Sequence, residues 1–407
     1  MSLITRTAFP LPMQYLGSKQ RISTWILEEI DQKFAATSHI VDLMSGSGSI
    51  AHEANMRGWN VHANDIQPYS HRVLKSAFET SREGLGEIIE WLASGALDAT
   101  LLDNGRSSAT HALQEEDSLF ARALSDDLDW QEYAAFCKRV NGAHTSATGN
   151  YDLFTSYYPN TYFGVRQCLE IDAIREKASQ SSADTASHLV AALISSLTFV
   201  SSTTTHLAQF LKPTSSSTST NLINCRSRSV QEHVLKRLRL LMNYPTPNVA
   251  RTSNLTFEKV LTDFAFDPNQ TVVYADPPYF KEHYSRYYHV LDTLALYDYP
   301  NLTYNQRIGS VTVGRYRDDR IVSDFGLRSK VAETFSKMFT LANSRDLNMA
   351  LSYASTSLLP AERIVSLAQA CGYHVEIKTT ELRHSGQGQL RAKSDVTEYL
   401  FLLSNDH

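Results

Sequence analysis

The stretch that most constrains the fold is residues 39–66, HIVDLMSGSGSIAHEANMRGWNVHANDI. A short apolar run, HIVDL, predicts a buried strand, and NVHAND predicts a second strand that ends on Asp65. Between them, IAHEANMRG predicts a helix that ends at Gly58, because glycine is favoured at helix C-termini. A strand, a helix and another strand in close succession predict a βαβ unit and therefore a parallel sheet.

The alternation of strands and helices returns only from about residue 248. Near the end of the chain, YHVEIKTTELRHS and VTEYLFLLS predict a closing antiparallel pair. Residues 76–247 predict short helices, with a Ser/Thr-rich loop at 201–220. The simplest arrangement is one α/β domain, residues 1–75 and 248–407, split by a mainly helical insertion, residues 76–247, which we expect to recognise the target.

Composition excludes several classes of protein. The four cysteines lie far apart and form no CxxC pair, which argues against a disulfide framework or a zinc site and fits a reducing cytoplasm. No apolar run reaches the roughly 20 residues of a transmembrane helix, so we expect no membrane partner.

The net charge of −5 is local and does not exclude nucleic acid. Residues 83–132 hold twelve acidic and two basic residues, whereas the rest of the chain holds 36 basic and 31 acidic residues. The acidic segment is typical of a solvated face or a flexible excursion.

The turn DLMSGSGS joins the first predicted strand to its helix. Gly46 and Gly48 allow a tight turn and the close approach of a ligand, and the helix N-terminus that follows presents free N–H groups. Asp65, at the end of the next strand, can accept hydrogen bonds from both hydroxyls of a ribose. The turn lacks the third glycine of GxGxxG, so it requires no phosphate ligand, and a βαβ turn without any ligand remains an alternative.

A second strand ends on an acid in VVYADPPY, residues 272–279. Pro277 and Pro278 bias the backbone away from helix and remove N–H donors, which leaves two stiff acceptors, the Asp276 carboxylate and the Pro277 carbonyl. Tyr279 adds a flat ring for stacking. Two acceptors beside a ring suit the amino group of adenine, because holding both N–H groups lets the nitrogen lone pair point at an electrophile. A turn that merely ends a strand is the alternative.

In this order, QYLGSKQRI, DLMSGSGS, AND and YADPPY resemble the motifs of the Dam-like alpha group of DNA adenine-N6 methyltransferases. The resemblance covers residues 13–75, 155–212 and 249–405. It implies an α/β class I S-adenosylmethionine-dependent methyltransferase fold, Rossmann-like with a mostly parallel seven-stranded sheet. It also implies S-adenosylmethionine as methyl donor, with no metal.

The resemblance implies roles for individual residues. Tyr15 and Lys19 would lie beside the cofactor, the glycine turn under its methionine part and Asp65 at its ribose. An Asp rather than a Ser at position 276 favours adenine over cytosine. Asp263 would contact the adenine of the cofactor, with a cap or solvated acid as the alternative. The implied cofactor-binding residues are Tyr15, Lys19, Asp42, Gly46, Gly48, Asp65, Asp263 and Asp276, and the implied catalytic residues are Asp276, Pro277, Pro278 and Tyr279.

A base inside a duplex cannot reach such a pocket, so the target adenine would be flipped out of double-stranded DNA. Basic stretches at 226–239, 307–330 and 383–393 are candidates for phosphate contacts, with a solvated face as the alternative for each. The predicted DNA-binding residues are Arg226, Arg228, Arg286, Arg315, Arg317 and Arg320.

Three functions remain open. The first is a DNA methyltransferase that is either solitary or the modification part of a restriction system, with a cognate restriction endonuclease as partner. The second is an RNA adenine-N6 methyltransferase. The third is a methyltransferase-like nucleic-acid-binding protein without turnover.

Overall fold

The computed structural model describes residues 7–103, 107–141, 148–203, 207–245, 248–278, 284–307, 309–382 and 396–405. Contacts divide the chain into two compact units. We call them the sheet unit, residues 15–79, 245–285 and 321–407, and the helical unit, residues 1–14, 80–244 and 286–320.

The sheet unit is built on seven strands in the order β3-β2-β1-β4-β7-β9-β8. The pairs from β3 through β7 are all parallel, whereas β9 runs antiparallel to both of its neighbours. This confirms the mostly parallel seven-stranded sheet and the closing antiparallel pair. The strands are β1 (His39–Asp42), β2 (Asn60–Asn64), β3 (Ala250–Ser253), β4 (Thr271–Ala275), β7 (Asn348–Ala354), β8 (Tyr373–Leu382) and β9 (Val396–Asn405).

Helices connect these strands, as a parallel sheet requires. The predicted βαβ unit is present as β1, α2 and β2, and α2 ends two residues before Gly58. The elements of this unit are η1 (Lys19–Arg21), α1 (Ser23–Lys33), α2 (Ser49–Met56), α3 (Pro68–Phe78), α13 (Phe257–Asp263), η2 (Asp324–Gly326), α16 (Val331–Asn343) and α17 (Ala361–Ala370).

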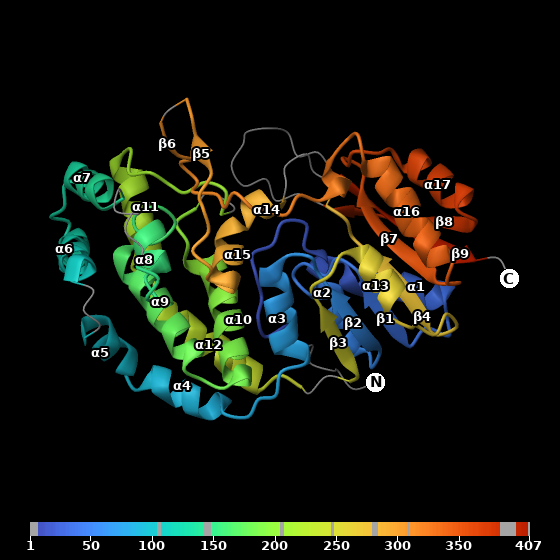
Figure 1. Cartoon of the computed structure of the whole chain (residues 1–407), viewed down its shortest axis with the longest axis horizontal. Helices are drawn as coiled ribbons and strands as arrows, with labels where there is room; N and C mark the ends of the chain where they lie inside the picture. The colour runs from blue at the N-terminus through green and yellow to red at the C-terminus, as the bar shows by residue number, and fades with distance from the viewer. Residues whose placement is uncertain are drawn as a thin grey trace. The chain divides into compact units, whose positions relative to one another are not determined.

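Successive side chains of a strand point to opposite faces, so the central strands are buried on both sides. On one face, Val41, Val273 and Met349 pack in a core with residues of α13, α16 and α17, such as Phe335. Figure 1 shows α13 and α16 in front of the strands. Because both faces are covered, the edge formed by the strand ends is where a ligand can reach the backbone.

The helical unit consists of helices around the buried helix α10 (Ala183–Val200). By length and composition α10 could cross a membrane, but 78% of its apolar window is buried inside the protein, as in the core helix of a soluble protein. Two short strands, β5 (Tyr304–Asn305) and β6 (Ser310–Val311), form a hairpin in this unit (Figure 1). The other helices are α4 (Leu85–Ala93), α5 (Ala96–Asp103), α6 (Ser107–Leu124), α7 (Trp130–Val140), α8 (Leu153–Tyr157), α9 (Val165–Ser179), α11 (Ser216–Arg226), α12 (Val230–Met242) and α15 (His289–Leu296), and α14 (Tyr284–Tyr287) crosses from the sheet unit into this one.

Two features differ from the sequence-based expectation. Part of the Ser/Thr-rich segment is helical, because the Ser215 side chain accepts a hydrogen bond from the Thr218 N–H and so caps α11. Residues 286–320 cluster with the helical unit, since α15 packs on α10. The functional division into a methyltransferase domain and an inserted target-recognition domain stays a prediction.

Candidate active site

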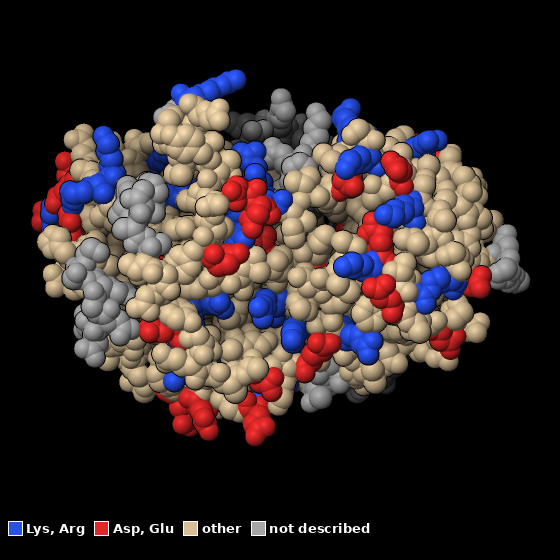
Figure 2. All heavy atoms as spheres, in the orientation of Figure 1, with Lys and Arg blue, Asp and Glu red and all other residues tan. Residues whose placement is uncertain are grey.

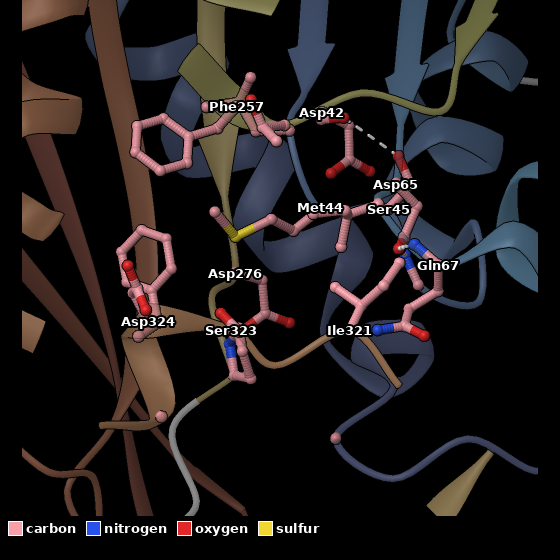
Figure 3. Close-up of a pocket in the computed structure, with 18 of the residues that line it drawn as sticks. Asp42, Met44, Ser45, Asp65, Gln67, Phe257, Asp276, Ile321, Ser323 and Asp324 are labelled. Atoms are coloured by element: carbon pink, nitrogen blue, oxygen red, sulfur yellow. Dashed lines mark hydrogen bonds between the residues drawn. The ribbon is translucent and has the colours of Figure 1, made fainter. Parts of the chain in front are cut away.

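A cavity of about 460 Å³ opens in the sheet unit at the carboxyl ends of β1, β2 and β4. This is the edge at which open α/β sheets bind ligands. Figure 3 shows Asp42, Asp65 and Asp276 arranged around it. Of the predicted site residues, those that line the cavity are Tyr15, Lys19, Asp42, Gly46, Asp65, Asp276 and Pro278.

The glycine turn forms one wall of the cavity. Gly46 has a φ of +52°, which an L side chain rarely adopts, and the Tyr15 ring lies directly against it. A Cβ at Gly46 would come within 2.9 Å of that ring. Gly48, at φ +77°, is the N-cap of α2 and does not line the cavity. The two glycines therefore shape the turn, and only Gly46 exposes backbone to a ligand.

Asp65 fixes the glycine turn to the end of β2. Its carboxylate accepts hydrogen bonds from the Gly46 N–H at 2.7 Å and the Gln67 N–H at 2.8 Å. Burial raises the pKa of Asp65, and these N–H groups act in the opposite direction. Because a carboxylate has about four acceptor positions, the carboxylate keeps capacity for another donor. The ribose contact stays a prediction beside this structural role.

Asp276 follows β4 and faces Lys19, which belongs to η1. The Lys19 Nζ lies 3.0 Å from Asp276 Oδ1, and only 4% of the Lys19 side chain is exposed. Burial raises the pKa of Asp276 to about 7, although the Lys19 ammonium opposes this shift. Asp276 can therefore change its protonation state near neutral pH.

The two prolines after Asp276 differ in position. Pro277 is buried, and Pro278 lines the cavity. Tyr279 lies outside the described residues, so its predicted stacking role stays a prediction. The structure thus describes the exit from β4 up to Pro278, and its stiffness stays a prediction.

Asp42, the last residue of β1, is the most unusual carboxylate of the cavity. It is 1% exposed, and its Oδ1 has no hydrogen-bond partner among the described residues. Burial raises the pKa of Asp42 to about 8. A buried polar atom without a partner at a cavity wall is satisfied when a ligand donates to it. The donor it calls for is a cationic or N–H group.

Apolar residues that the sequence analysis missed complete the cavity. Phe257 begins α13 after β3, and Met44 and Leu255 lie nearby on the wall. In Figure 3 the Phe257 ring and the Met44 side chain both reach the cavity. Phe257 follows β3, the strand that ends beside β2, and this position could have indicated a site residue. The signal was missed because β3 (ARTS) is too short and polar to be recognised as a strand from the sequence.

The prediction for Asp263 is not supported by its position. Asp263 is exposed at the end of α13, at the other end of that helix from the residues that line the cavity. The lining residues are Phe257 and Glu258, at the start of the helix. The start of a helix that follows a parallel strand lies at the carboxyl edge of the sheet, whereas the helix end lies away from it.

Three of the predicted DNA-binding residues are buried in the helical unit, which argues against phosphate contacts. Arg226 is 1% exposed and donates to Tyr133 Oη, Asn160 Oδ1 and the Thr161 carbonyl. Arg315 is 4% exposed and donates to the carbonyls of Tyr157 and Asn141.

Arg317 is 3% exposed and forms ion pairs with Asp298 and Asp319 at 2.7 and 2.9 Å. These three arginines hold the helical unit together. The sequence could not reveal this for Arg226 and Arg315, because their partners are distant along the chain.

The other three predicted arginines keep access to solvent. Arg228 is exposed, and Arg286 and Arg320 are half-buried on the Tyr316 ring, with guanidinium carbons 5.4 and 4.9 Å from its centre. Their contact with DNA stays a prediction. The basic stretch 383–393 lies outside the described residues.

Together the sheet order, the glycine turn after β1 and the acid-ended strands define a class I methyltransferase fold. Residues 15–104 match the family model of the D12 class N6 adenine-specific DNA methyltransferases. This part of the chain is similar to that family, which confirms the expected resemblance.

Three curated proteins extend the similarity over most of the chain. The Type II methyltransferase M.FokI of Planomicrobium okeanokoites is 24% identical over 97% of this chain and 53% of its own length. The Type II methyltransferase M.CviAII of Paramecium bursaria Chlorella virus 1 is 25% identical over 96% of this chain and 97% of its own length. The modification methylase LlaI of Lactococcus lactis subsp. lactis is 24% identical over 91% of this chain and 51% of its own length. The chain thus spans about half the length of two of these relatives.

Proposed function

We propose that this protein is a site-specific DNA methyltransferase that transfers a methyl group from S-adenosylmethionine to N6 of a flipped-out adenine. The observation that carries the proposal is that Asp276 and the Gly46 turn border one cavity. If they had lain in separate places, the base site and the cofactor site could not work together.

The residues of the cavity suit this cofactor, which supplies an electrophilic methyl group on a cationic sulfonium. Asp42 presents a buried carboxylate oxygen without a partner, which is suited to the cofactor ammonium. Phe257 offers an apolar face for a purine. Gly46 lines the cavity, and because it has no Cβ the Tyr15 ring can lie directly against it on the cavity wall.

Asp276 would orient the amino group rather than act as a strong base. Its Oδ1 faces Lys19, which leaves Oδ2 to accept one N–H of adenine, and the Pro277 carbonyl would accept the other. Fixing both N–H groups directs the nitrogen lone pair along the line of attack. As the N–C bond forms and the S–C bond breaks, the nitrogen becomes cationic and then releases a proton.

The test is incorporation of labelled methyl groups. The protein is incubated with labelled S-adenosylmethionine and with DNA or RNA from a strain that lacks adenine methylation, and the products are digested to nucleosides. We expect label in N6-methyl-2′-deoxyadenosine. Label in RNA would support the RNA enzyme instead, and no label in either would support a binding protein without turnover.

Asp276→Ala provides the residue-level prediction. Loss of the oriented acceptor should lower the rate of methyl transfer by at least about 100-fold, while binding of the cofactor, measured by calorimetry, stays largely intact. Normal incorporation by this variant would contradict the assigned base site.

Membership of a restriction-modification system and the presence of a cognate endonuclease are part of the proposal, supported by what the relatives are called. Sequencing the DNA that the protein methylates would identify the modified motif. An endonuclease that cuts the same motif only when it is unmethylated would be the expected partner, and methylation without any fixed motif would contradict site specificity.

A further inference from the structure

Lys19 contacts a second carboxylate that the proposed reaction does not use. Its Nζ lies 2.9 Å from Glu398 Oε1, in addition to the 3.0 Å contact with Asp276 Oδ1. Glu398 belongs to β9, the strand that closes the sheet, and its side chain is 1% exposed. The Ser352 hydroxyl of β7 donates to the same Oε1 at 2.6 Å. One ammonium is therefore shared by the buried carboxylate of Glu398 and the cavity-lining carboxylate of Asp276.

The fold alone does not call for a carboxylate at this position. Glu398 occupies a buried place in a strand whose other buried residues, such as Val396 and Leu400, are apolar. Burying an ion pair stabilises a protein little, and apolar residues of similar size often serve as well or better. Because burying the Glu398 carboxylate adds little to stability, its presence points to a role in the cavity. It would act there through Lys19, with which it forms an ion pair.

We propose that Glu398 is a positioning residue for methyl transfer: it fixes the Lys19 ammonium so that Lys19 orients the Asp276 carboxylate, and its negative charge keeps that carboxylate a strong acceptor. This rests on the proposed function for the assignment of Asp276 as the base-site acceptor. Without Glu398, the Lys19 ammonium would interact with Asp276 alone. It would then pull the Asp276 carboxylate away from the adenine amino group.

The charges around Asp276 make this role measurable. Lys19 lowers the pKa of Asp276 and Glu398 raises it, with burial as the main cause of the raised value of about 7. Asp42 at the end of β1 and Tyr274 of β4 also line this cavity. Burial raises the pKa of each, and the charge of Asp276 adds to this shift. Neutralising Glu398 removes one of the negative charges that oppose ionisation of Asp276, so its pKa should fall.

The experiment compares Glu398→Gln with Glu376→Gln. Glu376 lies on the adjacent strand β8 and forms ion pairs with Lys33 and Lys378 at 3.0 and 3.1 Å, near the surface. It is therefore a matched carboxylate in the same part of the sheet, outside the cavity. Single-turnover methylation of DNA is measured from pH 5 to 9, together with cofactor affinity and the melting temperature.

For Glu398→Gln we expect the acidic limb of the pH profile to move to lower pH by about one unit. The plateau rate should fall by about tenfold or more because the acceptor is weakened and misplaced. Cofactor affinity should stay close to that of the wild type, and Glu376→Gln should leave the profile unchanged. A purely structural role of Glu398 would lower the melting temperature without moving the limb, and that result would overturn the proposal.

A second readout does not depend on turnover. The carboxyl-carbon NMR signal of Asp276 is assigned by its absence in Asp276→Asn. Following this signal against pH gives the titration midpoint of Asp276 in the wild type and in Glu398→Gln. A lower midpoint in Glu398→Gln supports the charge coupling, and an unchanged midpoint overturns it. If the wild type methylates no DNA but the midpoint shifts, the proposed function fails while the coupling between these residues stands.

Discussion

Three aspartates at one cavity show how strongly surroundings decide what a single residue does. Asp65 accepts two backbone N–H groups, Asp276 pairs with Lys19, and Asp42 keeps an oxygen without a partner among the described residues. Burial raises the pKa of each carboxyl, most clearly that of Asp42. The sequence identified all three as candidates, but it could not show which of them was left unsatisfied.

Asp42→Asn should stabilise the protein and weaken the cofactor site. Burial raises the folded-state pKa of Asp42 to about 8, above the ordinary aspartate value of 3.8. Between these values the folded state binds more protons than the unfolded state, so Asp42 costs stability progressively as the pH rises through this window. The variant should therefore show a gain in free energy of unfolding that is absent near pH 3, grows toward pH 8 and then levels off, as measured by denaturant unfolding.

Because Asn offers no charge to a cationic ligand, the same variant should bind S-adenosylmethionine about tenfold more weakly or worse. Calorimetry above pH 8, where Asp42 is ionised, gives the clearest comparison. A variant that is no more stable at pH 8, or that binds the cofactor as well as the wild type, would contradict the role of this carboxylate.

At the scale of elements, buried charged side chains tie helix ends together in the helical unit. Glu116 accepts the N–H groups of Val165 and Arg166 at the start of α9, and Glu170 accepts that of Val230 at the start of α12. These carboxylates satisfy helix N-termini that have no partner within the helix. Arg226, at the end of α11, is also buried inside the helical unit.

Arg226→Met and Arg228→Ala separate the structural arginine from the exposed one. Removing Arg226 leaves the Asn160 and Thr161 oxygens without their donor, so the free energy of unfolding should fall by about 3 kcal/mol or more. The Arg228 side chain is exposed and donates to the Phe199 carbonyl at 2.7 Å, so its loss should cost about 1 kcal/mol or less. Equal costs in denaturant unfolding would contradict this assignment.

At the scale of the whole molecule, charge is mixed rather than segregated. Figure 2 shows Lys and Arg interspersed with Asp and Glu over the face in view. With a net charge of −5, binding to DNA must rely on a few local cations rather than on the overall field. Of the predicted DNA-binding arginines, those that keep access to solvent are thus the ones whose loss should matter.

Arg228→Ala should weaken DNA binding at every sequence and lower the slope of log K against log salt by about one. Arg251→Ala is the control, since Arg251 is exposed near the amino end of β3, away from the carboxyl edge that holds the cavity. Fluorescence anisotropy with a short duplex at several salt concentrations measures both. An unchanged slope in Arg228→Ala would remove this residue from the DNA surface.

The sequence by itself determined the βαβ unit, the closing antiparallel strands, the glycine turn and the Asp-Pro-Pro exit of β4. These depend on local patterns, namely the alternation of apolar residues, the freedom of glycine and the stiffness of proline. Such patterns act between neighbours in the chain, so they can be recognised without knowing what packs against them.

Only the tertiary structure decided the partners of the charged residues. It joined Lys19 to Glu398, 379 positions later, buried Arg226 and Arg317, and placed Phe257 rather than Asp263 at the cavity. Whether an arginine is exposed to solvent or is buried among acceptor oxygens depends on which distant segments surround it. That choice is made by packing, because a buried charge is tolerated only where the fold supplies its partners.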